Sequence, residues 1–236
     1  MNLKRNINQS ANALLHVFFP HICEGCGSDV LNENNILCSR CFSSLDETKF
    51  ESIPNNPIEK IFIGRLKIEE ATSLIYFAKQ SVIQRLIHQL KYKHNKEVGL
   101  FLGKLLGTRI LHSPRFKNID YLIPIPLHPK KEKLRGYNQS HLICKGMQEG
   151  LKIPIDTNVL RRTENTDSQT KKTRIQRWKS MEGKFLLQNY HHLKNKNILL
   201  IDDVITTGNT FESCGNALLS IEGLKISIAS VCYAKD

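Results

Sequence analysis

The spacing of apolar residues changes repeatedly along the chain between residue 65 and the C-terminus. Residues 81–92 carry apolar side chains at positions 82, 83, 86, 87 and 90, which is the spacing of one face of a helix. Shorter runs rich in Ile, Leu and Val have the length and composition of buried strands. The pattern predicts helices over 81–92, 98–111, 136–151 and about 209–221, and strands over 71–77, 119–127, 197–202 and 225–234.

The order of these elements indicates the fold class. Strands that alternate with helices and are apolar on both faces are typical of a mostly parallel sheet covered by helices. We therefore expect an α/β fold in which ligands bind at the carboxyl ends of the strands. Two further short strands are expected at 157–162 and 183–188, on either side of a basic segment. Asn138 is a candidate N-cap for the helix predicted over 136–151.

The first 64 residues do not follow this alternation. Asn12 and His16 interrupt the apolar stretch near the N-terminus, which predicts an amphipathic helix docked on the protein rather than a secretory signal. No stretch reaches the roughly 18 apolar residues of a membrane span, so we expect a cytoplasmic protein. A polar, proline-containing stretch at 46–60 is typical of a linker or surface loop. The predicted division is 1–50 for the helix and a cysteine module, 51–64 for a linker, and 65–236 for the main domain.

Four of the seven cysteines form two C-x-x-C pairs separated by eleven residues. Two such pairs close together predict a tetrahedral zinc site, and four thiolates leave no open position, so the zinc would be structural. The alternatives are buried core cysteines or disulfides, and a reducing cytosol argues against disulfides. The predicted ligands are Cys23, Cys26, Cys38 and Cys41.

Positive charge is concentrated in two short segments. The chain has a formal net charge of +12, and residues 128–135 and 161–179 contribute +3 and +5 of it. Clustered Lys and Arg favour a polyanionic ligand, either a phosphate compound or a nucleic-acid backbone, although such runs are often only a solvated face.

The segment NILLIDDVITTGNT, residues 197–210, combines a strand with polar groups suited to an anion. The strand is expected to end at Asp202 and Asp203, and a turn rich in hydroxyls then opens the next helix. The free N–H groups of a helix start can hold a phosphate, and Gly208 allows the backbone to approach it. The two carboxylates would accept hydrogen bonds from a sugar diol, directly or through Mg²⁺. A phosphorylated pentose that carries a pyrophosphate fits this order of groups.

Two nucleotide-binding motifs that share parts of this pattern are absent. An apolar strand that ends in Asp-Asp resembles a Walker B strand, but the chain has no G-x-x-x-x-G-K-[ST] loop. The dinucleotide fingerprint G-x-G-x-x-G is also missing. A helix cap with incidental threonines remains as the plain structural alternative.

The segment LLIDDVITTGNT resembles the phosphoribosyl-pyrophosphate loop of the type I phosphoribosyltransferases. Together with the cysteine pairs, IPIPLHPKKEKLRGYNQSHLI (123–143) and the basic segment at 161–185, it makes nearly the whole chain similar to the ComF family, which is linked to bacterial competence. The resemblance implies a type I phosphoribosyltransferase fold with a small N-terminal zinc module, and use of Mg²⁺ with phosphoribosyl pyrophosphate.

The resemblance also implies roles for particular residues. Asp202 and Asp203 would meet the ribose hydroxyls, and a mobile lid near 166–177 would contribute Lys171 and Arg174 to catalysis. The 5′-phosphate would be held by Thr206, Thr207, Gly208, Asn209 and Thr210. The pyrophosphate side would be formed by the loop with Pro126, Leu127 and His128, helped by Lys130, Lys131 or Arg135.

Two functions of different classes follow. The first is a phosphoribosyltransferase whose acceptor the sequence does not identify. The second is a competence factor that keeps the ligand pocket but binds single-stranded DNA or proteins of DNA uptake and processing. Tyr92, Tyr137 and Trp178 lie among basic residues and are candidates for stacking on bases, although each is more commonly a packed ring.

Overall fold

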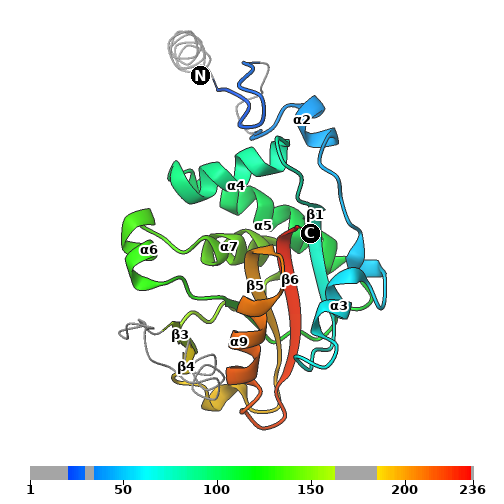
Figure 1. The fold of residues 1–236 in the computed structure, drawn as a ribbon, viewed down its shortest axis with the longest axis vertical. Helices are drawn as coiled ribbons and strands as arrows, with labels where there is room; N and C mark the ends of the chain where they lie inside the picture. The colour runs from blue at the N-terminus through cyan, green and yellow to red at the C-terminus, as the bar shows by residue number, and fades with distance from the viewer. Residues whose placement is uncertain (1–20, 30–34, 163–184, 235–236) are drawn as a thin grey trace, which may run out of the picture.

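A four-stranded sheet forms the centre of the computed structural model, which describes residues 21–29, 35–162 and 185–234 (Figure 1). The strand order is β1-β6-β5-β2, and every neighbouring pair is parallel. The predicted fold class is therefore confirmed. The strands are β1 (Ala71–Tyr76), β2 (Tyr121–Pro124), β5 (Asn197–Ile205) and β6 (Lys225–Tyr233).

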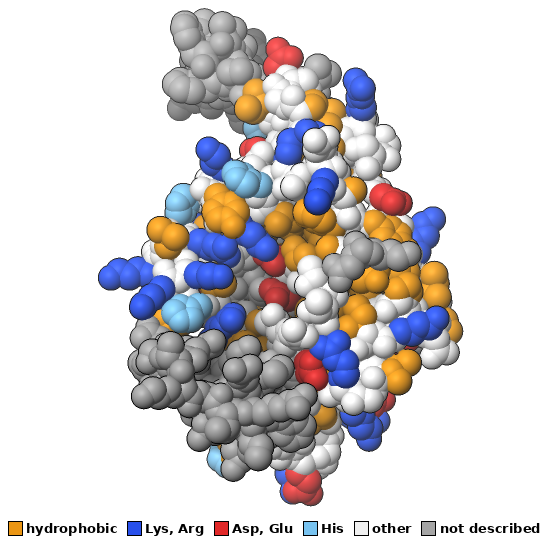
Figure 2. All heavy atoms as spheres, in the orientation of Figure 1, with side chains coloured by type: hydrophobic (Ala, Val, Ile, Leu, Met, Phe, Trp, Pro, Cys, Tyr) orange, Lys and Arg blue, Asp and Glu red, His pale blue; other side chains and the backbone are white. Residues whose placement is uncertain are grey.

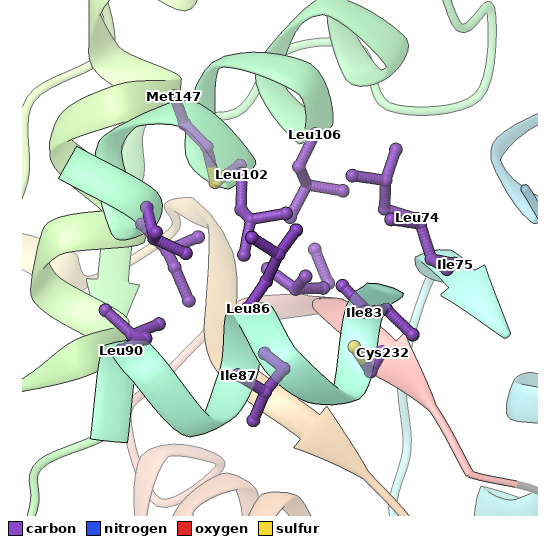
Figure 3. Close-up of a cluster of buried hydrophobic side chains, with 14 of the residues drawn as sticks. Leu74, Ile75, Ile83, Leu86, Ile87, Leu90, Leu102, Leu106, Met147 and Cys232 are labelled. Atoms are coloured by element: carbon purple, nitrogen blue, oxygen red, sulfur yellow. The ribbon is translucent and has the colours of Figure 1, made fainter. Parts of the chain in front are cut away.

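Helices cover both faces of this sheet because its strands are apolar on both sides. In β5, Leu199 and Ile201 belong to one buried cluster, whereas Ile198 and Leu200 belong to the other. Helices contribute side chains to both clusters, and Figure 3 shows part of the first one. The first face carries α4 (Val82–Tyr92), α5 (Lys96–Leu111) and α7 (Gln139–Leu151), and the second carries α3 (Pro57–Phe62) and α9 (Asn209–Leu218).

Polar caps fix where the helices on the first face begin. The side chain of Ser81 accepts a hydrogen bond from the backbone of Gln84 at the start of α4. Asn138 does the same for Ser140 at the start of α7, as the sequence predicted. A capping side chain satisfies N–H groups that have no partner inside the helix, so these residues set the register of each helix against the sheet.

Helices α5 and α7 pack closely because glycines line their contact. Gly99, Gly103 and Gly107 recur every four residues and therefore lie on one face of α5. A Cβ atom on Gly103 would collide with the backbone of Ile143, and one on Gly146 with the backbone of Leu100. The missing side chains thus allow the two backbones to touch.

Several elements differ from the sequence predictions. The stretch 46–60 is not a surface loop, because it contains α3, whose Ile58 is fully buried. Asn56 caps α3 and donates to the carbonyl oxygen of Ala71 in β1, which ties this segment to the sheet. The basic stretch after β2 forms a helix that was not predicted, α6 (Pro129–Arg135). The domain boundaries themselves stay predictions.

The remaining short elements lie outside the central sheet. The two predicted short strands are present as β3 (Leu160–Arg162) and β4 (Phe185–Leu187), and they pair antiparallel. The docking helix predicted at the N-terminus lies outside the described residues. Within the described ranges, none of the helices has the length and apolar character needed to cross a membrane. The short elements outside the central sheet are α2 (Ser39–Ser43), η1 (Phe50–Ser52), β3 (Leu160–Arg162), β4 (Phe185–Leu187) and η3 (His191–Leu193).

The glycine contact gives a test of the fold. Replacing Gly103 with Ala should lower the free energy of unfolding by about 1–3 kcal/mol, because the methyl group forces the two helix backbones apart. Gly150→Ala is the matched control, since Gly150 lies in α7 with no atom near its missing Cβ. That control should be neutral or stabilising by up to about 1 kcal/mol. Urea unfolding of both variants measures the difference, and equal effects would contradict the packing described.

Candidate functional site

Two adjacent carboxylates lie where β5 extends beyond its neighbour β2. Pairing between these strands ends at Pro124 and Ile201, so Asp202 and Asp203 follow directly at the carboxyl edge of the sheet. On its other side β5 continues to Ile205, opposite Tyr233. The prediction that the strand ends at Asp202 was therefore three residues short, and the acidic pair sits inside the strand. This position holds the carboxylates on rigid backbone.

The carboxyl group of Asp202 is held by two hydrogen bonds and carries a perturbed pKa. The hydroxyl of Ser140 donates to its Oδ1 at 2.8 Å, and the backbone N–H of Asp203 donates to the same atom at 2.9 Å. Burial, followed by the neighbouring charge of Asp203, raises the pKa of Asp202 to about 7. A carboxyl group of this kind can accept or release a proton near neutral pH.

Asp203 is neutralised by a lysine that the sequence reasoning did not place in the site. Lys91 Nζ lies 2.9 Å from Asp203 Oδ2, and both side chains are largely buried. Lys91 comes one turn after Ile87 in α4, so it continues the face that packs against the core. A lysine at a position where the periodicity demands an apolar residue was the signal that could have identified it.

The turn after β5 leaves the start of α9 open. Gly208 is the N-cap residue of α9 with φ 75°, and it has no side chain to satisfy the first N–H groups of the helix. A Cβ atom at this position would lie 2.8 Å from Ile61 and 3.0 Å from Phe62, so glycine is required by space as well as by backbone angle. The predicted residues Thr206, Thr207, Asn209 and Thr210 flank it in one continuous segment.

The loop predicted to form the pyrophosphate side begins at the same edge of the sheet. It follows β2 directly, and Asn138 holds it by donating to the carbonyl oxygen of Ile125 at 2.9 Å. The ring of His128 accepts a hydrogen bond from the backbone of Lys130 and so caps α6. A cavity of about 350 Å³ is lined on one side by Pro126 and Leu127 and on the other by residues of β3.

Arg135 ends α6 and points back toward the helices of the first face. Its guanidinium donates to Gln139 Oε1 at 2.9 Å and lies 5.4 Å from the ring centroid of Tyr92. Figure 2 shows acidic side chains in a hollow of this face, beside a gathering of Lys, Arg and His side chains. The predicted catalytic residues Lys171 and Arg174 lie outside the described residues.

The four predicted metal ligands come together in a second site. The sulfur atoms of Cys23, Cys26, Cys38 and Cys41 all lie within 4.8 Å of one another. Gly25 makes this possible, since a Cβ atom there would lie 2.8 Å from Cys41 Sγ. The cluster fits the closed donor set of a structural metal ion.

The thiols of the cluster differ in their surroundings. A hydrogen bond with Ser28 lowers the pKa of Cys26 to about 6, whereas burial raises that of Cys41 to about 12. The backbone N–H of Cys38 points at Cys23 Sγ, 3.2 Å away, which favours a thiolate there.

The cysteine cluster is fixed to the main body through α4. Gln89 donates to the carbonyl oxygen of Glu24 at 2.8 Å, and Asn95 donates to the Glu24 carboxylate at 2.8 Å. Cys23 and Cys41 also belong to the buried cluster that covers the first face of the sheet. The module therefore shares a core with the sheet.

Comparison with known proteins identifies similar chains. The family profile described as phosphoribosyl transferase domain matches residues 142–236. The DNA utilization protein YhgH of Escherichia coli O157:H7 is 29% identical over 150 residues, which cover 62% of this chain and 65% of that protein. The competence protein ComFC of Bacillus subtilis strain 168 is 37% identical over 109 residues, 46% of this chain and 42% of that protein.

A match among solved structures has low sequence identity. The glutamine phosphoribosylpyrophosphate amidotransferase of B. subtilis, complexed with ADP and GMP, is 15% identical with a TM-score of 0.42. The match covers 61% of this chain and 30% of that protein.

Proposed function

Because the chain belongs to the ComF family of proteins with a phosphoribosyltransferase domain, we propose that its site binds phosphoribosyl pyrophosphate together with Mg²⁺. The observation that carries the proposal is that one short segment, residues 202–210, contains both the acidic pair and the uncapped start of α9. Carboxylates suit a diol, and free backbone N–H groups suit a phosphate.

The proposed reaction is displacement of pyrophosphate from the anomeric carbon. As the pyrophosphate departs, positive charge develops on the ribose ring, and the nearby carboxylates of Asp202 and Asp203 stabilise it. Mg²⁺, when bound, neutralises charge on the pyrophosphate. Arg135 and the lysines of α6 add positive charge on the side where the leaving group would lie. Lys171 and Arg174 are proposed to complete this side from the lid. The proposal does not assign the acceptor group that would replace the pyrophosphate on the anomeric carbon.

A second candidate function is binding of single-stranded DNA, in line with the names of the relatives. The observation that favours it is Tyr92, whose side chain is 61% exposed although it lies beside the guanidinium of Arg135. Exposed Lys93 follows Tyr92 in the sequence, and exposed lysines also lie in α6, the helix that ends at Arg135. An exposed aromatic ring among cations is the arrangement on which bases stack while phosphates pair with lysines. Proteins of DNA uptake or processing are the partners expected for such a role.

The metal of the cysteine cluster is proposed to be zinc, with a structural role. Four sulfur donors with no carboxylate or water are typical of structural zinc sites. Free thiols of this kind also fit a reducing compartment, so we propose a cytoplasmic location.

Isothermal titration tests the ligand proposal. Phosphoribosyl pyrophosphate with Mg²⁺ should bind the wild type, and the double substitution Asp202→Asn/Asp203→Asn should weaken binding at least about a hundredfold, because two charge-assisted contacts are lost. Glu222→Gln is the control, since its exposed carboxylate pairs with Lys194 before the start of β6, at the opposite edge of the sheet. Absence of binding to the wild type would refute the proposal.

Salt titration tests the DNA proposal. The affinity for a single-stranded oligonucleotide should fall linearly on a log–log plot against salt concentration, because phosphate binding releases counterions. Tyr92→Ala should weaken binding about tenfold or more, the usual effect of losing one stacked base. Tyr190→Ala, a partly buried tyrosine between β4 and β5, should leave the affinity unchanged. An affinity that does not depend on salt would rule out phosphate contacts.

Metal analysis tests the zinc proposal. Protein purified without chelators should contain about one zinc ion per chain, and Cys26→Ser/Cys38→Ser should contain far less. Cys214→Ala removes a buried thiol outside the cluster and should keep the metal. Wild-type protein without zinc would show that the cluster has another role.

A further inference from the structure

The end of α3 and the residues that follow it, 61–66, pack against the turn of residues 206–210 and the start of α9. Ile61 and Phe62 contact Gly208 so closely that no side chain fits there. Leu66 lies against Gly215 in the same way, since a Cβ atom on Gly215 would come 2.5 Å from it. The edge-to-face contact of Phe62 with Phe211 adds to this support, with ring centroids 6.4 Å apart. The start of α9 therefore rests on a chain segment about 140 residues away in sequence.

Arg65 makes the polar contacts of this support. Its Nη1 donates to the carbonyl oxygen of Thr207 at 2.8 Å, and its Nη2 donates to Asn209 Oδ1 at 2.7 Å. The same Nη2 lies 2.6 Å from Glu212 Oε2. Nη1 also reaches the carbonyl oxygen of Ile61 at 3.2 Å, which ties the guanidinium to its own segment. One side chain thus joins the residues on both sides of Gly208.

These contacts bear on the binding of an anion. Glu212 lies in the first turn of α9, where its negative charge would repel a phosphate at the helix start. Asn209 carries an amide oxygen that could otherwise accept from the free N–H groups. Arg65 occupies both acceptors and neutralises the charge of Glu212. The N–H groups of the turn are left for a ligand.

We propose that Arg65 is a positioning residue that keeps the 206–210 turn ready for a phosphate group, an inference that rests on the proposed function of this site. It acts through Thr207, Asn209 and Glu212 rather than by reacting with the ligand. A planar guanidinium can make these contacts at once, whereas a lysine ammonium is a single point of charge.

Two measurements test the proposal. In titrations with phosphoribosyl pyrophosphate and Mg²⁺, Arg65→Gln should weaken binding about tenfold or more, and Arg65→Lys should restore only part of it. Adding Glu212→Gln to Arg65→Gln should recover affinity, because the uncompensated negative charge is removed. A purely structural role would not produce this recovery. Arg109→Gln is the matched control, since Arg109 pairs with Glu47 on an exposed surface away from the turn.

The second measurement needs no ligand. Amide hydrogen exchange of peptides that cover residues 203–213 should become faster in Arg65→Gln than in the wild type and Arg109→Gln. If exchange is unchanged, or if the wild type binds the ligand and Arg65→Gln binds it equally well, the positioning role is wrong. If exchange changes as expected but the wild type binds no ligand, Arg65 still orders the turn, and the proposed function of the site fails instead.

Discussion

The ion pair between Lys91 and Asp203 is the constraint around which the site is built. A buried strand that carries two adjacent carboxylates is costly unless the charges find partners. Asp203 is paired with the lysine of α4, and Asp202 is held by Ser140 at the start of α7. Two of the helices that cover this face, α4 and α7, therefore each supply one polar contact to the end of β5. Helix packing and site geometry are set together, because neither helix can shift without exposing a carboxylate to an apolar environment.

On the other side of the end of β5, the path of the turn is set mainly by the backbone conformation of Gly208. Gly208 has a positive φ and a space too small for any side chain, so the turn can follow only one path over Ile61 and Phe62. The N–H groups at the start of α9 are presented by that path. Arg65 then removes the two acceptors that compete for them. The proposed anion site therefore depends on a segment distant in sequence.

Local signals made much of this predictable. The parallel sheet, the helix over 81–92 and the cap at Asn138 follow from periodicity and capping, and the cysteine spacing identified the cluster that could hold a metal. Helix α3 was missed because the prolines and polar residues around it are typical of loops, whereas its burial comes from tertiary contacts with β1 and α9. Arg65 was missed because its partner Glu212 lies more than 100 residues away, and no local pattern of charge reveals such a pair. Lys91 also pairs with a distant residue, and its local signal is a lysine at an apolar position of the helix periodicity.

Helix α4 connects the two sites of the protein. Gln89 contacts the backbone of Glu24 within the cysteine turn, and Lys91 contacts Asp203 in the sheet. Two positions along a helix correspond to a rotation of about 200°, so these contacts leave α4 on nearly opposite sides. A rotation or shift of the helix would disturb both at once. The cysteine module, although small and at one end of the molecule, therefore helps to fix the helix whose lysine neutralises Asp203.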